Sequence, residues 1–213
     1  MAGSSKFETL TAGTHVPFPE YEEPPHEPIP LVRHWLTEAE RLGVREPKAL
    51  ALATADLAGR ASNRIVAITR ITDEGIEFTS HTTSQKGREI AATGWASGVL
   101  YWRETGQQIV LSGPVTALPE DVCDALWAAR PTPLHAMSTA SEQSAQLDDV
   151  TTLRKRAEAL ESLGVPLRRP ARFVGYLLSI AAVEFWSASP DRLHRRLRYD
   201  RSADGWRTSR LQP

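Results

Sequence analysis

The stretch KALALATADLAGRASNRIVAITRITDEGIEFTS, residues 48–80, decides the fold class. It contains three runs rich in aliphatic residues and threonine, at 48–56, 61–69 and 76–80, and two short polar links, DLAG and TDEG. Runs of this length, separated by links that carry glycine and aspartate, are typical of β-strands joined by tight turns. The stretch therefore predicts successive strands linked as hairpins.

Further strands are predicted downstream of this stretch, at 96–102 and 107–118. Five strands then lie within about 70 residues, with too little chain between most of them for the crossover helices that parallel pairs require. This spacing favours a mostly antiparallel barrel over a parallel sheet. The last third returns to strands, at 172–188, 193–201 and 205–213, with SADG as a hairpin turn. The predicted fold class is α+β.

Helical segments flank the predicted strands. They are expected at 30–43, 84–93, 119–130 and 148–164. Ser84 is placed to cap the second helix, and Pro119 is placed to open the third. The intervening segment PTPLHAMSTASEQSAQ, at 131–146, is polar and is predicted as a loop.

The N-terminal part differs in composition from the rest of the chain. Residues 17–30 include six prolines and four glutamates, which disfavours a regular helix or a central strand. We therefore expect residues 1–27 to form an extended or disordered arm. Residues 28–213 show no internal repeat or composition break and are predicted to form a single domain.

Composition indicates a globular chain without a strong overall field. The 213 residues include 25 basic and 26 acidic side chains, a formal net charge of -1, so no general attraction to nucleic acid or anionic lipid is expected. Cys123 is the one cysteine, which excludes an intramolecular disulfide and fits a reducing compartment. No apolar segment is long enough to cross a bilayer. The sequence predicts a cytoplasmic protein with no membrane or nucleic-acid partner.

Common nucleotide-binding and metal-binding signatures are absent. Neither GxGxxG nor the P-loop motif occurs, so a dinucleotide fold or a P-loop does not hold a phosphate here. The six histidines lack the HExxH spacing, and no metal site is predicted. Any phosphate must be bound by other side chains.

Cationic side chains gather near the end of the chain. Residues 184–213 contain seven arginines against four acidic residues, interleaved with aromatic side chains. If 192–199 forms a strand, alternate residues share one face. That face holds Arg192, His194, Arg196 and Arg198. It suits a solvated edge, an anion clamp or a nucleic-acid surface, and the pattern alone does not choose among them.

Other side chains that suit a phosphate stand at the predicted ends of strands and helices. They are Arg64, the Ser84–Lys86 pair and Gln143–Ser144. Arginine together with hydroxyl and backbone donors binds phosphate through short, charge-assisted hydrogen bonds. Each of these residues alone is typical of a solvated surface. Their combination indicates an anion site.

Several motifs, taken in order, resemble one known family. They are RIVAIT (64–69), IEFTSHTTSQKGREI (76–90), GQQIVLSG (106–113), QS (143–144), EFW…RLHRRLRY (184–199) and GWRTSRLQP (205–213). From about residue 28 to the C-terminus, this series is similar to the FMN-dependent pyridoxamine 5′-phosphate oxidase family. The resemblance implies a split β-barrel flanked by helices. It also implies a homodimer whose two FMN sites are built by both chains at the interface.

The resemblance assigns individual residues to FMN. One subunit is expected to contribute Arg64, Ile65, Val66, Ala67, Thr79, Ser80, Gln85, Lys86 and Gln108. The partner chain is expected to contribute Gln143, Ser144, Trp186 and Arg196. Arg64 and Lys86, with the Ser80 hydroxyl, suit the ribityl phosphate, and an amide such as that of Gln108 suits the pyrimidine edge of the flavin.

Departures from the family pattern bear on the substrate. Where the vitamin-B6 enzymes have a lysine, a tyrosine and a serine around the substrate's phosphate, this chain has Thr69, Leu126 and Leu134, and only Arg130 of that clamp remains. An unpaired buried phosphate would cost several kcal/mol, about 3 or more. The substrate site is expected to include Thr69, Arg130, Arg192 and His194, with His194 as a possible proton acceptor.

Within the family, the chain is most similar to the flavin oxidases of phenazine biosynthesis. This similarity implies dehydrogenation of a hexahydro- or tetrahydrophenazine carboxylate, with hydride passed to flavin N5 and O2 as the electron acceptor. A pyridoxamine or pyridoxine 5′-phosphate oxidase is the first alternative. The second is a split-barrel protein that binds flavin, haem or nucleic acid without catalysing oxidation.

Overall fold

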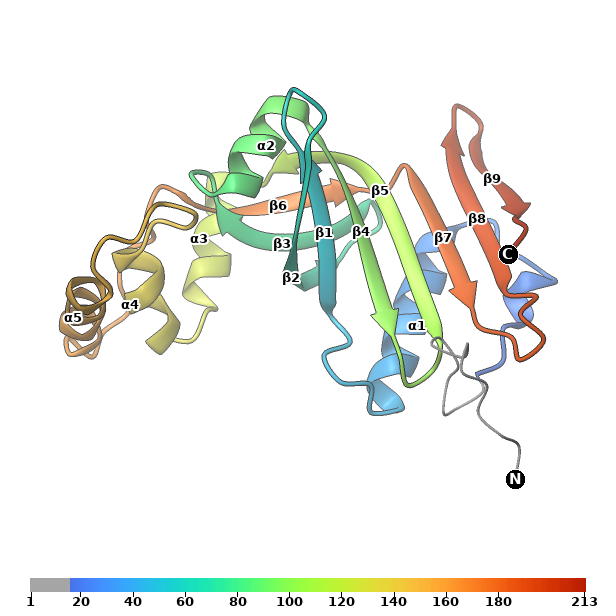
Figure 1. Cartoon of the computed structure of the whole chain (residues 1–213), viewed down its shortest axis with the longest axis horizontal. Coiled ribbons are helices and arrows are strands. Elements are labelled where there is room, and N and C mark those ends of the chain that lie inside the picture. The colour runs from blue at the N-terminus through green and yellow to red at the C-terminus, as the bar shows by residue number, and fades with distance from the viewer. Residues whose placement is uncertain (1–15) are drawn as a thin grey trace.

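The structure is a computed structural model that describes residues 16–213. It is built around an antiparallel sheet with helices packed at its sides (Figure 1). The strands of this part are β1 (Ala49–Ala55), β2 (Ala61–Ile71), β3 (Gly75–His81), β4 (Trp95–Trp102), β5 (Gln107–Ala117), β6 (Phe173–Ser179), β7 (Ala182–Ser187), β8 (Arg195–Ser202) and β9 (Gly205–Arg210). The helices are α1 (Pro28–Arg41), α2 (Gln85–Thr93), α3 (Glu120–Ala128), α4 (Pro133–Ala140) and α5 (Val150–Glu161), with a 3-10 turn η1 (Pro19–Tyr21).

The sheet closes on itself through β5. The strand order is β4-β1-β2-β3-β6-β5-β7-β8-β9, and β4 also pairs with β5. Residues 107–112 of β5 pair with β7, whereas residues 115–117 pair with β6. Strands β1 to β6 therefore form a closed barrel, and β7, β8 and β9 extend from it as an open sheet. The predicted α+β split barrel is confirmed.

The change of partner along β5 occurs at Gly113. A Cβ atom there would lie 1.8 Å from the carbonyl oxygen of Ser179. The chain passes from β6 to β7 through two residues, and the Ala181 N–H donates to the Ser112 carbonyl at 2.9 Å. Glycine is required because the two backbones approach too closely for any side chain. The apolar run 172–188 is thus divided into β6 and β7, which pair with different parts of β5.

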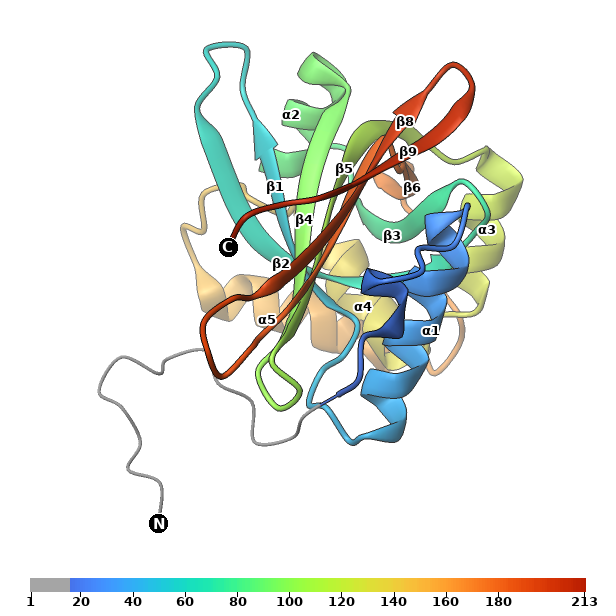
Figure 2. The ribbon, with the colours of Figure 1, turned by 90° about the vertical axis from the view of Figure 1, so that its right-hand side faces the viewer.

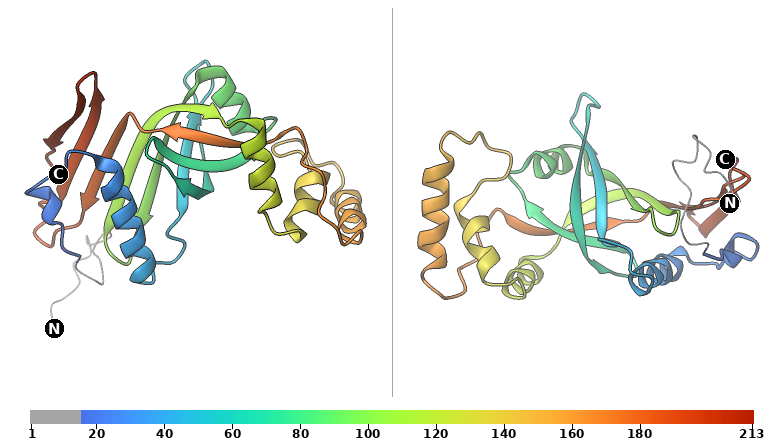
Figure 3. Two further views of the ribbon diagram at one scale, coloured as in Figure 1. Left: turned by 180° about the vertical axis from the view of Figure 1, so that it is seen from behind. Right: turned by 60° about the horizontal axis from the view of Figure 1, so that its bottom comes forward.

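Helices α3, α4 and α5 lie at the opposite end of the molecule from the C-terminal strands (Figure 1). Figures 1 and 3 show α3, α4 and α5 at one end of the barrel and β8 and β9 at the other. Figure 2 looks from the second end and places the β8–β9 hairpin in front, with α1 beside it. Trp35 of α1 packs edge-on against Phe185 of β7, with ring centroids 5.2 Å apart. This contact attaches α1 to the open part of the sheet.

The predicted N-terminal arm is only partly described. Residues 1–15 lie outside the described residues. Residues 16–27 pack against the domain, since Phe18 is 2% exposed and its ring contacts Trp35 at 4.8 Å. The Tyr199 hydroxyl donates to a carbonyl of this segment at 3.1 Å. These residues are therefore tied to the domain, because an aromatic anchor among the prolines supplies apolar contact that composition alone did not reveal.

One helix was predicted wrongly as a loop. Residues 133–140 form α4, which begins with Pro133 in its first turn and buries Ala136 and Ala140. Proline is favourable at this position because its missing N–H would have no helical partner. The other predicted helices are present, and Ser84 caps α2 as expected. Within residues 16–213, no helix is both long enough and apolar enough to span a bilayer.

We predict that Gly113→Ala destabilises the protein by about 3 kcal/mol, because the added methyl group would overlap the Ser179 carbonyl. Gly98→Ala is the matched control and should cost less, since the atoms nearest its methyl group would belong to the Leu50 side chain and not to the backbone. Urea unfolding of both variants measures the difference. Equal losses of unfolding free energy would show that the partner exchange at β5 does not depend on this glycine.

Candidate functional site

The start of α2 is held tightly against the end of β3. The Ser84 side chain accepts a hydrogen bond from the Gly87 N–H at 3.1 Å and donates to the His81 carbonyl at 2.7 Å. A Cβ atom on Gly87 would lie 2.3 Å from that same carbonyl oxygen. The helix start thus carries a partial positive charge beside the strand end. This geometry suits an anion.

Lys86 extends from the first turn of α2 into a group of polar side chains. Its Nζ lies 3.1 Å from Ser80 Oγ, 3.5 Å from Ser84 Oγ and 3.4 Å from Gln143 Oε1. Burial, followed by the nearby charge of Arg64, lowers the pKa of Lys86. The Lys86 ammonium group is therefore held among neutral oxygens, and within the described residues it has no carboxylate partner.

Gln143 and Ser144 reach this group from the segment that follows α4. Ser144 Oγ accepts a hydrogen bond from the Gln85 N–H at 3.1 Å, and Ser144 has a left-handed backbone with φ 69°. The structure places both residues beside the start of α2 in the same chain. Their contribution to an FMN site from a partner chain stays a prediction.

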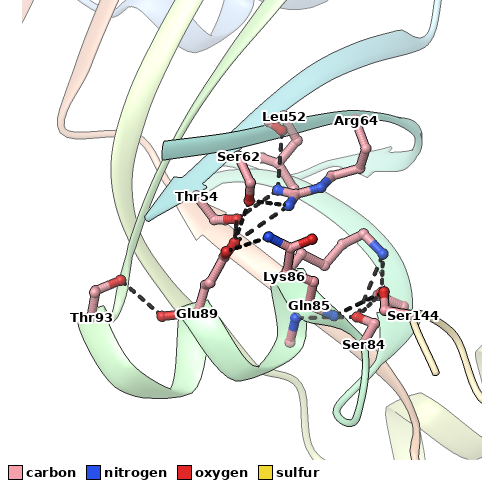
Figure 4. Close-up of polar contacts among 12 residues, drawn as sticks. Leu52, Thr54, Ser62, Arg64, Ser84, Gln85, Lys86, Glu89, Thr93 and Ser144 are labelled. Atoms are coloured by element: carbon pink, nitrogen blue, oxygen red, sulfur yellow. Dashed lines mark hydrogen bonds and ion pairs between the residues drawn. The ribbon is translucent and has the colours of Figure 1, made fainter. Parts of the chain in front are cut away.

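A second polar group surrounds Glu89 on the next turn of α2. Figure 4 shows Arg64 directed at the Glu89 carboxylate and Lys86 directed away from it. Glu89 accepts hydrogen bonds from Ser62 Oγ at 2.6 Å and from the Gln85 amide at 2.9 Å. Arg64 Nη2 lies 3.3 Å from the same carboxylate. Arg64 is thus engaged by the protein itself rather than presented alone to a ligand.

The Glu89 carboxylate is 8% exposed and ionised. Burial opposes ionisation, but the hydroxyls of Ser62 and Thr54, the Gln85 amide and Arg64 outweigh it and lower the pKa of Glu89 to about 2. The sequence analysis did not identify this residue. The available signal was the position of Glu89, one helical turn after Gln85 and on the side of the predicted helix that carries Ile90. A carboxylate buried on that side requires hydrogen-bond partners.

A cavity of about 330 Å³ lies beside these groups. Most of its wall comes from β2, β3 and the segment after α3. It is lined by Ile65, Val66, Ala67, Thr69, Thr79, Ser80, His81, Lys86, Arg130, Ser138, Gln143 and Phe173. The structure therefore brings together most of the predicted cofactor residues and two of the predicted substrate residues. His81, Ser138 and Phe173 were not predicted.

The two predicted substrate residues in the cavity differ in whether their hydrogen-bond donors are free to contact a ligand. The Thr69 hydroxyl donates to the Glu77 carbonyl at 3.0 Å, so its hydrogen is already used. Arg130 donates to Ser138 Oγ at 3.3 Å and lies over the Phe173 ring at 5.8 Å. Burial lowers the pKa of Arg130, and its Nε has no hydrogen-bond partner among residues 16–213. Arg130 is the stronger candidate for an anionic ligand.

The remaining predicted cofactor residues form a separate row on the C-terminal strands. Gln108 of β5 pairs with Trp186 of β7, and Trp186 pairs with Arg196 of β8. Directly paired residues share one face of a sheet, so these three side chains are neighbours. Arg196 forms a two-point ion pair with Glu184, at 2.7 and 3.1 Å. None of the three lines the cavity described above.

Arg192 and His194 precede β8 and do not belong to it. The prediction that they share a strand face with Arg196 is wrong, because Arg192 has φ 66° and the strand begins at Arg195. The His194 ring lies 4.8 Å from the Trp186 ring. Its Nδ1 accepts from the Ser189 N–H at 3.1 Å, which places the proton of the neutral ring on Nε2. His194 is therefore arranged as a hydrogen-bond donor rather than a proton acceptor.

No metal centre is apparent in the part of the chain that the structure describes, where His, Cys, Asp and Glu side chains form no group able to hold an ion. Of the three non-glycine residues with positive φ in that part, Ser144 and Arg192 are both predicted site residues. Such backbone conformations are costly and tend to occur at functional positions. The positive φ angles of Ser144 and Arg192 therefore support functional roles for the polar group around Lys86 and for the segment that precedes β8.

We predict that Glu89→Gln lowers the free energy of unfolding at pH 7 by about 2 kcal/mol, because Arg64 and two hydroxyls lose a charged acceptor. Since the folded-state pKa is depressed to about 2, the wild-type advantage is complete above the ordinary carboxyl pKa and shrinks as pH falls from about 4.5 toward 2. Unfolding titrations across this range measure it. Glu158→Gln, on the exposed face of α5, is the control. A pH-independent difference would contradict the assignment.

Two family models match the chain. The model described as "Pyridoxamine 5'-phosphate oxidase" matches residues 36–164. The model described as "Pyridoxine 5'-phosphate oxidase C-terminal dimerisation region" matches residues 173–213. The first covers β1 to β5 and most of the cavity wall, and the second covers β6 to β9. The second match supports the predicted homodimer.

Curated relatives extend over nearly the whole chain. The dihydrophenazinedicarboxylate synthase of Burkholderia lata is 56% identical over 99% of both chains. The protein of the same name from Pseudomonas chlororaphis is 48% identical over 100% of this chain and 96% of its own length. The pyridoxine/pyridoxamine 5′-phosphate oxidase of Gluconobacter oxydans is 35% identical over 88% of this chain and 94% of its own.

A solved structure agrees with these relatives. PhzG from Burkholderia lata, in complex with tetrahydrophenazine-1-carboxylic acid, superposes with a TM-score of 0.92 at 57% identity, covering 93% of this chain and 98% of PhzG. The barrel, the helices and the C-terminal strands are thus all present in that fold. The chain belongs to the pyridoxamine 5′-phosphate oxidase family.

Proposed function

We propose that this protein is an FMN-dependent oxidase of phenazine biosynthesis. It removes two electrons and two protons from a hexahydro- or tetrahydrophenazine carboxylate and passes the electrons to O2, which becomes hydrogen peroxide. The observation that carries the proposal is a single cavity with a phosphate-competent end at Lys86 and Ser80 and a second cation, Arg130, elsewhere on its wall. The similarity to dihydrophenazinedicarboxylate synthases supports the substrate class.

The residues around Lys86 fit the phosphate of FMN. Lys86 supplies a charge, Ser80 supplies a hydroxyl, and the start of α2 adds the partial positive charge of its backbone. This is the donor set that binds a phosphate monoester through charge-assisted hydrogen bonds. Strand β2 presents Ile65, Val66 and Ala67 along the same cavity, where an apolar ring system can lie. Arg64 lies behind this end of the cavity, where it forms an ion pair with Glu89.

A homodimer would join the two separated groups of side chains. The row of Gln108, Trp186 and Arg196 does not meet the cavity within one chain. The outward face of β2, β1 and β4 carries exposed apolar side chains, including Ile65 at 65% and Trp95 at 49% exposure. Burying such a face in a symmetric dimer is favourable. We propose that a second copy covers it and brings its own β7–β8 row to the cavity.

Bound FMN supplies the hydride acceptor, flavin N5, and the chain supplies position and charge. Arg130 offers its guanidinium to a substrate carboxylate, and the segment before β8 offers Arg192 and the Nε2–H of His194, whose ring lies beside Trp186. With Nδ1 of His194 occupied, a water is the better acceptor for the accompanying proton. The lone buried Cys123 fits the predicted cytoplasmic location.

The same cavity disfavours a vitamin-B6 phosphate. Thr69 is neutral and its hydroxyl is already bonded to a carbonyl. Leu126 and Leu134 stand where the vitamin-B6 enzymes have polar side chains. They do not line the cavity and contribute no polar group to it. A second phosphate would meet one cation, Arg130, together with the uncharged side chains of Ser138 and His81 at this end, which is too little positive charge for a dianion. Pyridoxine 5′-phosphate is therefore the less favoured substrate, although oxidases of that name are 35–38% identical to the chain.

We predict that Lys86→Met weakens FMN binding about 50-fold, because the phosphate loses its charged donor. Fluorescence titration of the apoprotein with FMN measures the change. Lys155→Met, on the exposed surface of α5, removes the same charge and should bind FMN like the wild type. If Lys86→Met kept its affinity, the phosphate would have to be bound elsewhere.

We predict that the purified protein is yellow and that tetrahydrophenazine-1-carboxylate bleaches its flavin band without oxygen. Admission of air should restore the band with release of hydrogen peroxide. Pyridoxine 5′-phosphate, offered at equal concentration, should bleach it at least about 100 times more slowly, since the cavity cannot pair its phosphate. Comparable rates would favour the vitamin-B6 reaction. A colourless protein that takes up no FMN would contradict any flavin function.

A further inference from the structure

His81 is the last residue of β3 and is buried on the wall of the cavity. Its side chain is among the buried polar groups, at 2% exposure. Its ring packs edge-on against Phe173, with centroids 6.3 Å apart, and Arg130 lies over that same phenyl ring. His81 and Arg130 therefore flank one aromatic side chain at one end of the cavity.

One nitrogen of the buried His81 imidazole, Nδ1, lacks the hydrogen-bond partner that a buried polar atom normally has. Nδ1 is fully covered and has none among residues 16–213. A buried polar atom without a partner destabilises a folded protein and is rarely kept without a reason. His81 lines the cavity, and its other ring nitrogen, Nε2, is not among the covered atoms. A bound molecule would therefore meet Nε2, whereas Nδ1 stays covered and costly to the protein.

The surroundings of His81 are electropositive. Burial, followed by the charges of Arg172, Lys86 and Arg130, lowers the pKa of His81 to about 4. The ring is therefore neutral at pH 7 and carries one N–H. Arg172 donates only to backbone carbonyls, including that of Ser138 at 3.2 Å. Within the described residues, none of the three cations has a carboxylate partner.

This arrangement contrasts with the other arginines near the site. Arg64 is paired with Glu89, and Arg196 is paired with Glu184. The protein therefore neutralises some cations itself, whereas Lys86 and Arg130 line the cavity without a carboxylate partner in the described residues. With Lys86 assigned to the phosphate, Arg130 remains for a second anion.

We propose that His81 determines specificity by donating a hydrogen bond from its neutral imidazole to the carboxylate of the tricyclic substrate, beside Arg130. This inference rests on the proposed function. The phosphate is assigned to the Ser80 side of β3 and the carboxylate to the His81 side, since consecutive residues of a strand direct their side chains differently. A neutral donor next to one arginine suits a singly charged carboxylate better than a phosphate dianion.

The test compares two variants of the FMN-loaded enzyme with two ligands. His81→Leu removes both ring nitrogens at similar volume, whereas His81→Gln keeps an amide N–H near the position of Nε2. The ligands are phenazine-1-carboxylate and unsubstituted phenazine, and binding is followed by calorimetry. His81→Leu should weaken phenazine-1-carboxylate about tenfold or more and leave phenazine unchanged. His81→Gln should retain most of the affinity for the carboxylate.

The melting temperature provides a second readout, and His81→Leu should change it in the opposite direction to its effect on carboxylate binding. Because the imidazole nitrogen is unpaired in the free protein, His81→Leu should not lower the melting temperature of the ligand-free holoenzyme and should raise it by a few degrees, about 2 to 4 °C. FMN affinity should stay within about twofold of the wild type. A residue that merely filled space would show the reverse pattern, with lower stability and equal weakening of both ligands.

Two outcomes would overturn the inference. If His81→Leu weakened both phenazines equally, or melted earlier than the wild type, His81 would serve packing or pairing within the protein. If the wild-type holoenzyme bound phenazine-1-carboxylate no better than phenazine, there would be no carboxylate contact to assign. Failure of the proposed function is distinct from both, because it would appear in the wild type as absence of bound FMN or of any phenazine binding.

Discussion

The edge of β5 that faces away from β4 is shared by two strands, and the rest of the structure depends on this division. A strand has only two edges for hydrogen bonding, and β4 occupies one of them along 107–114. The other edge pairs first with β7 and then with β6, and Gly113 allows the exchange. The barrel can therefore close while β7 to β9 remain outside it. The cavity and the C-terminal row are separated as a direct consequence.

The distribution of charge follows the same separation. Arg64 and Arg196 each meet a glutamate from within the chain, and this pairing compensates for burying the carboxylates of Glu89 and Glu184. Lys86 and Arg130 meet only neutral oxygens. The cavity is therefore electropositive in a protein whose formal net charge is -1. A local field of this kind selects anionic ligands without a general attraction to polyanions.

The sequence was informative about elements with strong local signals. The hairpin links of 48–80 and the Ser84 cap were placed correctly, because turn chemistry and capping act between near neighbours. The sequence was uninformative about the partners of Glu89 and His81. Nothing in the composition of α2 or β3 reveals that one is surrounded by donors from β1 and β2 and the other by three cations, since those neighbours are distant in the chain.

By itself, the sequence determined the strand-rich α+β architecture, the positions of four helices and the family resemblance, because these depend on periodicity, turn residues and ordered motifs. Only the tertiary structure decided that Gln143 and Ser144 join Lys86 and that Gln108 joins Trp186. It also decided which arginines are neutralised. The physical reason is that pairing, burial and charge compensation depend on contacts between segments, and those contacts exist only once the barrel has closed.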